Sequence, residues 1–396
     1  MSHDKLEHEK PEKIGLDKKA LKRLSAALER EIDAGRLPGA VAMIARGGRI
    51  GYFESFGKRS PAASDAMEKD AIFRIFSMTK PIVSTVVMQL AEEGRLQLAD
   101  PLSKYIPAFA DTKVGVVRDG ELALEPPRRA ILLHDLLRHT SGITYDFLGD
   151  HPVQRLYAQA KLARPDQTNA DQAEAIAKLP LLNHPGVQWD YGRSTDVLGA
   201  VVEIVTGQTL GEALRARVFD PLDMKDTGFH AAGARESRIA EPFPTDPETG
   251  APVKLFNAAK IAPFESGGGG LVSTAQDYAR FCMALVNGGS LGKTRLLGRK
   301  TLEFMASDHL GPHVSIGAND LLPPGHGFGL GYAVRLEPGI AATPGSPGLF
   351  FWGGIAGTTF WIDPEEDLFG LLLIQAPGQR DYYRMLFRSL VYAAVD

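Results

Sequence analysis

The chain contains the run Phe73-Arg-Ile-Phe-Ser77-Met-Thr-Lys80-Pro81, which sets a serine and a lysine three residues apart. Proline lacks an N–H group and is tolerated only near the start of a helix, so Pro81 predicts that a helix begins near Ser77. Residues at i and i+3 share a helix face, so the Lys80 amine can reach the Ser77 hydroxyl. A serine attacks well only when a base takes its proton, so this pair predicts a nucleophile; the alternative is a simple helix N-cap at Ser77.

The same Ser-x-x-Lys spacing recurs at Ser2/Lys5, Ser55/Lys58 and Ser290/Lys293. Ser2 lies in a charged leader, and Ser55 ends a strand-like run in which residues i and i+3 do not share a face. Ser290 also completes a Gly-x-Ser-x-Gly motif, but that motif needs a strand before the serine and a helix after it. A helical pattern precedes Ser290 instead, so we expect a glycine-rich surface loop there.

Two further segments carry candidate site residues. In Trp189-Asp-Tyr191-Gly-Arg-Ser194, we expect Ser194 to cap an apolar helix that Gly207 ends, which places Tyr191 on the loop before it. Near the C-terminus, residues 350–363 and 368–374 read as two strands of a hairpin. Glycines in the first of these strands admit a close backbone approach.

Together the three segments resemble the serine β-lactamase and penicillin-binding protein superfamily, whose motifs are Ser-x-x-Lys, a tyrosine-containing loop and a Lys-Thr-Gly-like strand. Supporting runs of the same resemblance lie at residues 136–142, 221–227 and 326–332. Within the superfamily the chain looks most like the family VIII carboxylesterases, in which the third motif is commonly Trp-x-Gly. That motif is here Trp352-Gly353-Gly354.

The resemblance implies a role for each matching residue. Ser77 is the expected nucleophile, Lys80 and Tyr191 are its expected base pair, and the backbone N–H groups of Ser77 and Ile355 form the expected oxyanion hole. Which of Lys80 and Tyr191 acts as the base stays open. Expected substrate-binding residues are Trp352, Gly353, Gly354, Tyr145, Phe147 and Phe351.

Two departures from the lactamase pattern bear on the substrate. Arg193 stands where the second motif usually has asparagine, and Trp352 stands where the third motif usually has lysine. The lysine would face a substrate carboxylate, and a neutral ester does not need it. Both departures favour ester chemistry over antibiotic hydrolysis, unless Arg193 turns into the cleft and supplies the missing cation.

The resemblance also implies an α+β fold like that of β-lactamases and penicillin-binding proteins. Residues 1–76 and 325–396 are expected to form an antiparallel sheet flanked by helices, and residues 77–324 a mainly helical domain. The active site is expected between the two, where clefts are common.

Composition agrees with a globular enzyme. The chain has 396 residues, a net charge of −4, 44% hydrophobic and 23% charged residues. Outside the N-terminal segment the sequence has no dense stripe of Lys and Arg residues that would predict nucleic-acid binding. No apolar stretch is long enough for a membrane span. The charged leader lacks the apolar core of a secretory signal, so we expect a cytoplasmic protein. The single cysteine, Cys282, has the spacing of a packing residue.

The remaining motifs have structural interpretations. His309 and His313 flank a Gly-Pro pair that breaks helical metal-ligand spacing, and we expect no metal and no cofactor. The run 267–270 lacks a P-loop lysine and is expected to be a tight backbone passage near the cleft. His326 is the least implausible histidine for a serine triad, although nothing local pairs it with Ser77.

The sequence therefore predicts a serine carboxylesterase that hydrolyses short-chain neutral esters, a small-molecule substrate, through an acyl-enzyme on Ser77. The alternatives are a β-lactamase or D,D-peptidase, an acyltransferase that passes the acyl group to an alcohol, and a ligand-binding homologue without catalysis. Oligomeric state is not predicted.

Overall fold

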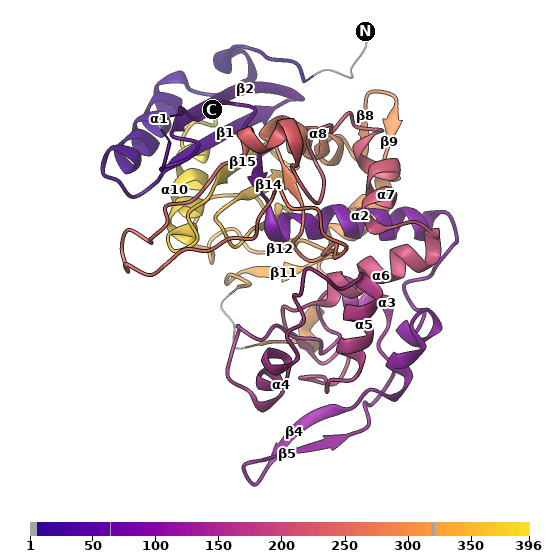
Figure 1. The fold of residues 1–396 in the computed structure, drawn as a ribbon. Coiled ribbons are helices and arrows are strands. Elements are labelled where there is room, and N and C mark those ends of the chain that lie inside the picture. The colour runs from indigo at the N-terminus through magenta and orange to yellow at the C-terminus, as the bar shows by residue number, and fades with distance from the viewer. Residues whose placement is uncertain (1–5, 64, 318–320) are drawn as a thin grey trace.

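The two ends of the chain form one antiparallel sheet in the computed structural model, which describes residues 6–63, 65–317 and 321–396 (Figure 1). Within this part of the chain the sheet has seven strands in the order β11-β12-β13-β14-β15-β1-β2. Their bounds are β1 Gly39–Arg46, β2 Arg49–Gly57, β11 His326–Phe328, β12 Ala333–Arg335, β13 Phe350–Gly353, β14 Thr359–Asp363 and β15 Leu368–Ile374. The two strands expected at residues 350–363 and 368–374 are three: the first is interrupted at residues 354–358 and forms β13 and β14, which pair with each other. β15 pairs with β14 on one side and with β1 on the other.

Helices cover both faces of this sheet. Successive strand residues point to opposite faces, and in β1 the side chains of Val41 and Met43 join one apolar cluster while Ala42 and Ile44 join another. The second cluster also holds α1 (Lys18–Asp33) and α10 (Arg380–Tyr392), which lie together on that face (Figure 1). On the opposite face, α8 (Ala275–Val286) packs against β1, β14 and β15.

A second group of elements is mainly helical. Its helices are α2 Thr79–Glu92, α3 Leu133–Leu137, α4 Pro152–Ala160, α5 Asn169–Ala177, α6 Ser194–Thr206 and α7 Leu210–Leu214. A small hairpin of β4 (Val114–Arg118) and β5 (Glu121–Glu125) projects from this group (Figure 1). The division at residues 77 and 325 stays a prediction, and the packing of α8 on the sheet favours grouping that helix with the sheet.

Short elements complete the chain: β3 Phe73–Arg74, β6 Gln188–Trp189, β7 Val272–Ser273, β8 Ser290–Leu291, β9 Thr294–Arg295, α9 Arg299–Met305 and β10 Ser315–Ile316. Ser290 begins a two-residue strand after α8, so it has neither flank of a nucleophile elbow. Ser2 and Lys5 lie outside the described residues. No single described helix is long and apolar enough to cross a membrane; α6 with the adjoining Leu210–Phe219 passes that test only as a pair bent by 79°.

Candidate active site

Ser77 lies at the start of α2, as the position of Pro81 predicts. A short 3-10 helix, Phe76–Met78, runs directly into α2, and Ser77 is partly exposed. Phe76 has a φ of 45°, a left-handed conformation that costs free energy for a side chain of this size. Backbone strain of this kind persists only where packing holds it, and here it turns the chain immediately before the predicted nucleophile.

The Lys80 amine is buried among three oxygen atoms. Its Nζ lies 3.2 Å from Ser77 Oγ, 3.1 Å from the Tyr145 hydroxyl and 2.6 Å from the Gly268 carbonyl oxygen. The Gly268 carbonyl can only accept a hydrogen bond, whereas both hydroxyl groups can also donate. A neutral amine in this position can therefore donate to Gly268 and turn its lone pair toward the Ser77 O–H.

Burial favours the neutral form of the Lys80 amine. Lys80 is 1% exposed, and loss of hydration lowers its pKa to about 7. Asp196 opposes this shift, and the positive charge of Arg193 adds to it. The lysine is thus poised to exchange a proton with Ser77 near neutral pH.

Tyr191 is the third member of this cluster. Its ring lies under the amine, with Lys80 Nζ 4.5 Å from the ring centroid. Trp352 Nε1 donates a 3.0 Å hydrogen bond to the phenol oxygen. Burial raises the pKa of Tyr191, while hydrogen bonds with Ser77 and Trp352 act against the rise. A neutral phenol between serine and tryptophan can therefore pass its own proton on.

His139 holds the loop that carries Tyr191. Its carbonyl accepts from the Asp190 N–H at 2.9 Å, its Nδ1 accepts from the Gly192 N–H at 3.4 Å, and its ring lies 4.7 Å from the Tyr191 ring. Burial and the nearby Lys80 hold the pKa of His139 well below its usual range, so Nδ1 stays free to accept. His139 therefore accepts hydrogen bonds from both chain neighbours of Tyr191, which are Asp190 and Gly192.

The expected cap at Ser194 is wrong. Ser194 is the first residue of α6, its N-cap is Arg193, and no side chain caps the helix. The Ser194 hydroxyl instead shares a 2.8 Å hydrogen bond with Ser141, which ties α6 to the segment of His139. The predicted helix end at Gly207 is confirmed, with a left-handed φ of 72°.

The third motif approaches the Ser77 segment closely through its glycines. A Cβ on Gly354 would lie 2.5 Å from the Ile75 carbonyl oxygen, and Thr358 Oγ1 donates to the same carbonyl at 3.3 Å. Ile355 follows Gly354 in a tight turn, and its N–H has no acceptor among the described residues. Ser77 N–H, in the first turn of its helix, is likewise a free donor by position. The two N–H groups of the expected oxyanion hole therefore belong to segments in contact.

The aromatic residues expected to bind substrate divide into two groups. Tyr145 and Phe147 stack with ring centroids 4.8 Å apart, and Phe147 is exposed. Phe351 does not share their place: it lies under Arg388 of α10 and beside His326, on the face of β13 opposite Trp352. Neighbouring strand residues alternate faces, so Trp352 and Phe351 cannot both line the cluster.

Arg193 and the glycine run also lie beside Lys80. Arg193 Nη2 donates to Asp146 Oδ1 at 3.1 Å, and its guanidinium lies over the Tyr145 ring. Gly268 donates its N–H to Asp196 Oδ1 at 2.9 Å, and a Cβ at this glycine would meet the same carboxylate at 2.6 Å. The run 267–270 is thus the tight backbone passage that the sequence predicts.

The histidines singled out by sequence lie apart from Ser77. His309 pairs with His134 at 2.9 Å, and His326 Nδ1 faces the carbonyl groups of Pro323 and Pro324. Cys282 is buried in α8. In the described parts of the chain, no group of three or more His, Cys, Asp or Glu side chains could hold a metal ion.

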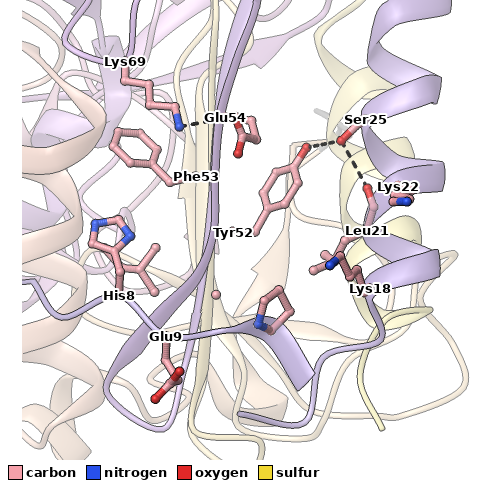
Figure 2. Close-up of a pocket in the computed structure, with 13 residues that line it drawn as sticks. His8, Glu9, Lys18, Leu21, Lys22, Ser25, Tyr52, Phe53, Glu54 and Lys69 are labelled. Carbon is pink, nitrogen blue, oxygen red and sulfur yellow. Dashed lines mark hydrogen bonds and ion pairs between the residues drawn. The ribbon is translucent and has the colours of Figure 1, made fainter. Parts of the chain in front are cut away.

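A separate hollow of about 440 Å³ lies along β2, beside α1 and the segment around His8 (Figure 2). Tyr52 shares a hydrogen bond with Ser25 on one side of the strand, and Lys69, which lies on the other side beside Phe53, pairs with Glu54. Its walls contain none of the residues around Lys80. The hollow is therefore separate from the cluster around Lys80.

Comparison with known proteins agrees with this geometry. A family model described as Beta-lactamase matches residues 24–393. The chain belongs to the beta-lactamase family. Esterase EstB of Burkholderia gladioli is 32% identical over 407 residues, covering 97% of this chain and 98% of EstB. Protein Rv1367c of Mycobacterium tuberculosis is 35% identical over 363 residues, covering 88% of each.

Two solved structures share the fold over almost the whole chain. EstCE1, described as a hydrolase with promiscuous acyltransferase activity, superposes with a TM-score of 0.81 at 27% identity, covering 94% of this chain and 98% of EstCE1. Simvastatin synthase LovD of Aspergillus terreus gives 0.78 at 25% identity, with the same coverage. The predicted fold and enzyme class, a serine hydrolase with esterase relatives, are confirmed.

Sequence reasoning missed two residues of the cluster. Tyr145 was expected only to bind substrate, yet its hydroxyl contacts Lys80, and no local pattern distinguishes the two roles. His139 lies within the supporting run 136–142 but received no role from the sequence, because the loop it contacts lies some fifty residues away in the chain. Contacts between distant segments leave no periodic signal in a single sequence.

Proposed function

We propose that this protein is a serine carboxylesterase that hydrolyses short, neutral esters through an acyl-enzyme on Ser77. The observation that carries the proposal is the Lys80 amine, buried with a pKa of about 7 and 3.2 Å from Ser77 Oγ. A base of this pKa adjoining a serine on the same helix turn is the arrangement that acyl transfer needs.

In the first step, neutral Lys80 takes the Ser77 proton while Oγ forms a bond to the ester carbonyl carbon. The carbonyl oxygen becomes an oxyanion that the N–H groups of Ser77 and Ile355 would stabilise. The carbon–oxygen bond to the leaving alcohol then breaks, and the alkoxide takes a proton from Tyr191, which Lys80 replenishes. The raised pKa of Tyr191 favours this donor role and leaves Lys80 as the base.

The second step reverses these roles for water. Lys80, neutral again, takes a proton from a water molecule as its oxygen attacks the acyl carbon. Collapse of the second tetrahedral intermediate breaks the bond to Ser77, whose oxygen takes from Lys80 the proton that Lys80 removed from water. The products are the acid and the free enzyme.

The charges around the site favour a neutral substrate. Trp352 occupies the lysine position of the third motif, and its N–H is already bonded to Tyr191. Arg193, the other candidate cation, is paired with Asp146. A substrate carboxylate would lose hydration without gaining a free cation at either place, which costs several kcal/mol. The Trp-x-Gly motif also supports placing the chain in family VIII.

Acyl transfer to an alcohol is the second candidate, because EstCE1, which shares this fold, is described as a hydrolase with promiscuous acyltransferase activity. The same acyl-enzyme serves both outcomes, and the acceptor decides between them. Product analysis with an added short alcohol measures the ratio of new ester to acid.

The test compares kcat/KM for p-nitrophenyl butyrate and for a chromogenic cephalosporin on one preparation, with S77A as background. We expect the ester to be the better substrate by at least about two powers of ten, the factor that burial of an unpaired charge supports. Equal or greater efficiency on the cephalosporin refutes the ester proposal. A cytoplasmic location stays a prediction for cell fractionation.

A further inference from the structure

We propose that Arg193 and Asp146 form a charge pair that sets the pH range in which Lys80 accepts a proton. This inference rests on the proposed function, because it assumes that Lys80 is the base. Arg193 stands where the second motif usually has asparagine. In this role its charge acts on Lys80, and it does not contact the substrate.

Two cations share one aromatic ring. Arg193 Cζ lies 5.1 Å from the centroid of the Tyr145 ring, and Lys80 Nζ lies 5.4 Å from the same centroid. The Tyr145 hydroxyl also contacts Lys80 Nζ at 3.1 Å. The two charges are therefore no farther apart than the sum of the two ring distances. At such a separation in a buried site, each positive charge opposes the other.

Asp146 partly compensates Arg193. The Arg193 side chain is 10% exposed, whereas that of Asp146 is 31% exposed. Water therefore screens the carboxylate more than the guanidinium, and Arg193 Nε has no partner among the described residues. The pair should present a net positive field to Lys80, and Asp146 sets its strength.

Other groups around Lys80 supply a fixed background. Asp196 of α6 acts in the opposite direction to Arg193 and is held by Ser266 and the Gly268 N–H. His139, Tyr145 and Tyr191 also face the amine, and burial keeps all three neutral near pH 7. Arg193 and Asp146 are thus the two charges that can be changed without touching the hydrogen bonds of Lys80.

The test uses opposite charge changes in the same pair. Arg193→Met keeps the apolar stem and removes the cation together with a buried N–H that lacks a partner, so the fold should tolerate it. Asp146→Asn removes the anion but keeps the shape. Arg193→Lys restores the charge without the planar fork. Arg155→Met is the matched control, because Arg155 pairs with Asp150 at 2.7 Å on the exposed surface.

The readout is the acid limb of kcat/KM against pH for p-nitrophenyl butyrate. Loss of the Arg193 cation should move the midpoint of the acid limb to higher pH, by about half a pH unit to one pH unit. Loss of the Asp146 anion should move it to lower pH by a similar amount. Arg193→Lys should bring the limb back toward the wild-type value, and Arg155→Met should not move it. Circular dichroism and thermal melting confirm that each variant is folded.

Opposite shifts in the two variants support the proposal. The proposal is overturned if the acid limbs of both variants coincide with that of the wild type, or if both shift in the same direction. Arg193 would then have only a packing role. A parallel Lys80→Ala assay separates this failure from failure of the proposed function: if Lys80→Ala retains wild-type activity, Lys80 is not the base and both proposals fall. A change in cephalosporin hydrolysis by Arg193→Met, in either direction and without a shift of the acid limb, would also overturn the proposal. Arg193 would then contact the substrate and not set the pKa of Lys80.

Discussion

The indole N–H of Trp352 donates a 3.0 Å hydrogen bond to the phenol oxygen of Tyr191, joining the second and third motifs directly. The two rings lie 5.1 Å apart, and Tyr191 also carries Lys80 above its face. Because the tryptophan donor occupies one lone pair of the phenol oxygen, the Tyr191 O–H is free to point toward Ser77. Trp352 therefore orients Tyr191 and also makes the site more apolar.

Trp352→Phe should lower turnover by roughly one to two powers of ten, because loss of a buried donor costs about 1 to 3 kcal/mol. Trp189→Phe is the matched control: Trp189 also stacks near Tyr191, but its Nε1 has no partner among the described residues. Steady-state assays on a short ester compare the two. Similar losses in both variants would show that ring packing, and not the hydrogen bond, matters.

Ser77→Ala should reduce ester hydrolysis by at least about three powers of ten while the protein stays folded, because the nucleophile is lost. Ser290→Ala should retain most activity, since Ser290 lies in a short strand after α8. Activity assays with circular dichroism check both. Loss of activity in the Ser290 variant together with retention in the Ser77 variant would overturn the nucleophile assignment.

The rate should rise with pH through about 7. Lys80 acts as a base only when its amine is neutral, and the neutral fraction grows as pH passes the pKa of about 7. Lys80→Ala and Tyr191→Phe should each lose orders of magnitude, and the double variant should lose far less than the product of the two, because the residues act as one unit. A flat profile from pH 5 to 9, or strictly multiplicative losses, would contradict shared proton transfer.

His139→Leu should lower kcat more than it changes KM, because the Gly192 N–H loses its acceptor and the Tyr191 loop loosens. His139→Asn should recover much of the loss: asparagine can supply an acceptor and tolerates the φ of 56° that residue 139 adopts. Kinetics of the two variants on one ester decide the matter. Equal defects in both would leave His139 a general packing role.

Local patterns predicted the parts of the site that lie within single elements. Pro81 located the start of α2, and Gly207 located the end of α6. The prediction that Phe351 binds substrate was wrong, because a residue's position next to a motif does not determine which face of the strand its side chain lies on. The Ser194 cap was wrong because a distant hydroxyl, Ser141, competes for that side chain. The joining of the two chain ends in one antiparallel sheet was predicted from the family resemblance, since no local pattern encodes it.

The central claim is that Ser77 carries the acyl group. Intact-protein mass spectrometry with peptide mapping, after exposure to a p-nitrophenyl alkylphosphonate and separately to a penicillin, tests it most directly. We predict a single stoichiometric phosphonate adduct on Ser77, no adduct on the Ser77→Ala variant, and little or no penicilloyl enzyme. An adduct that maps to another residue, or that forms equally on Ser77→Ala, would contradict the account.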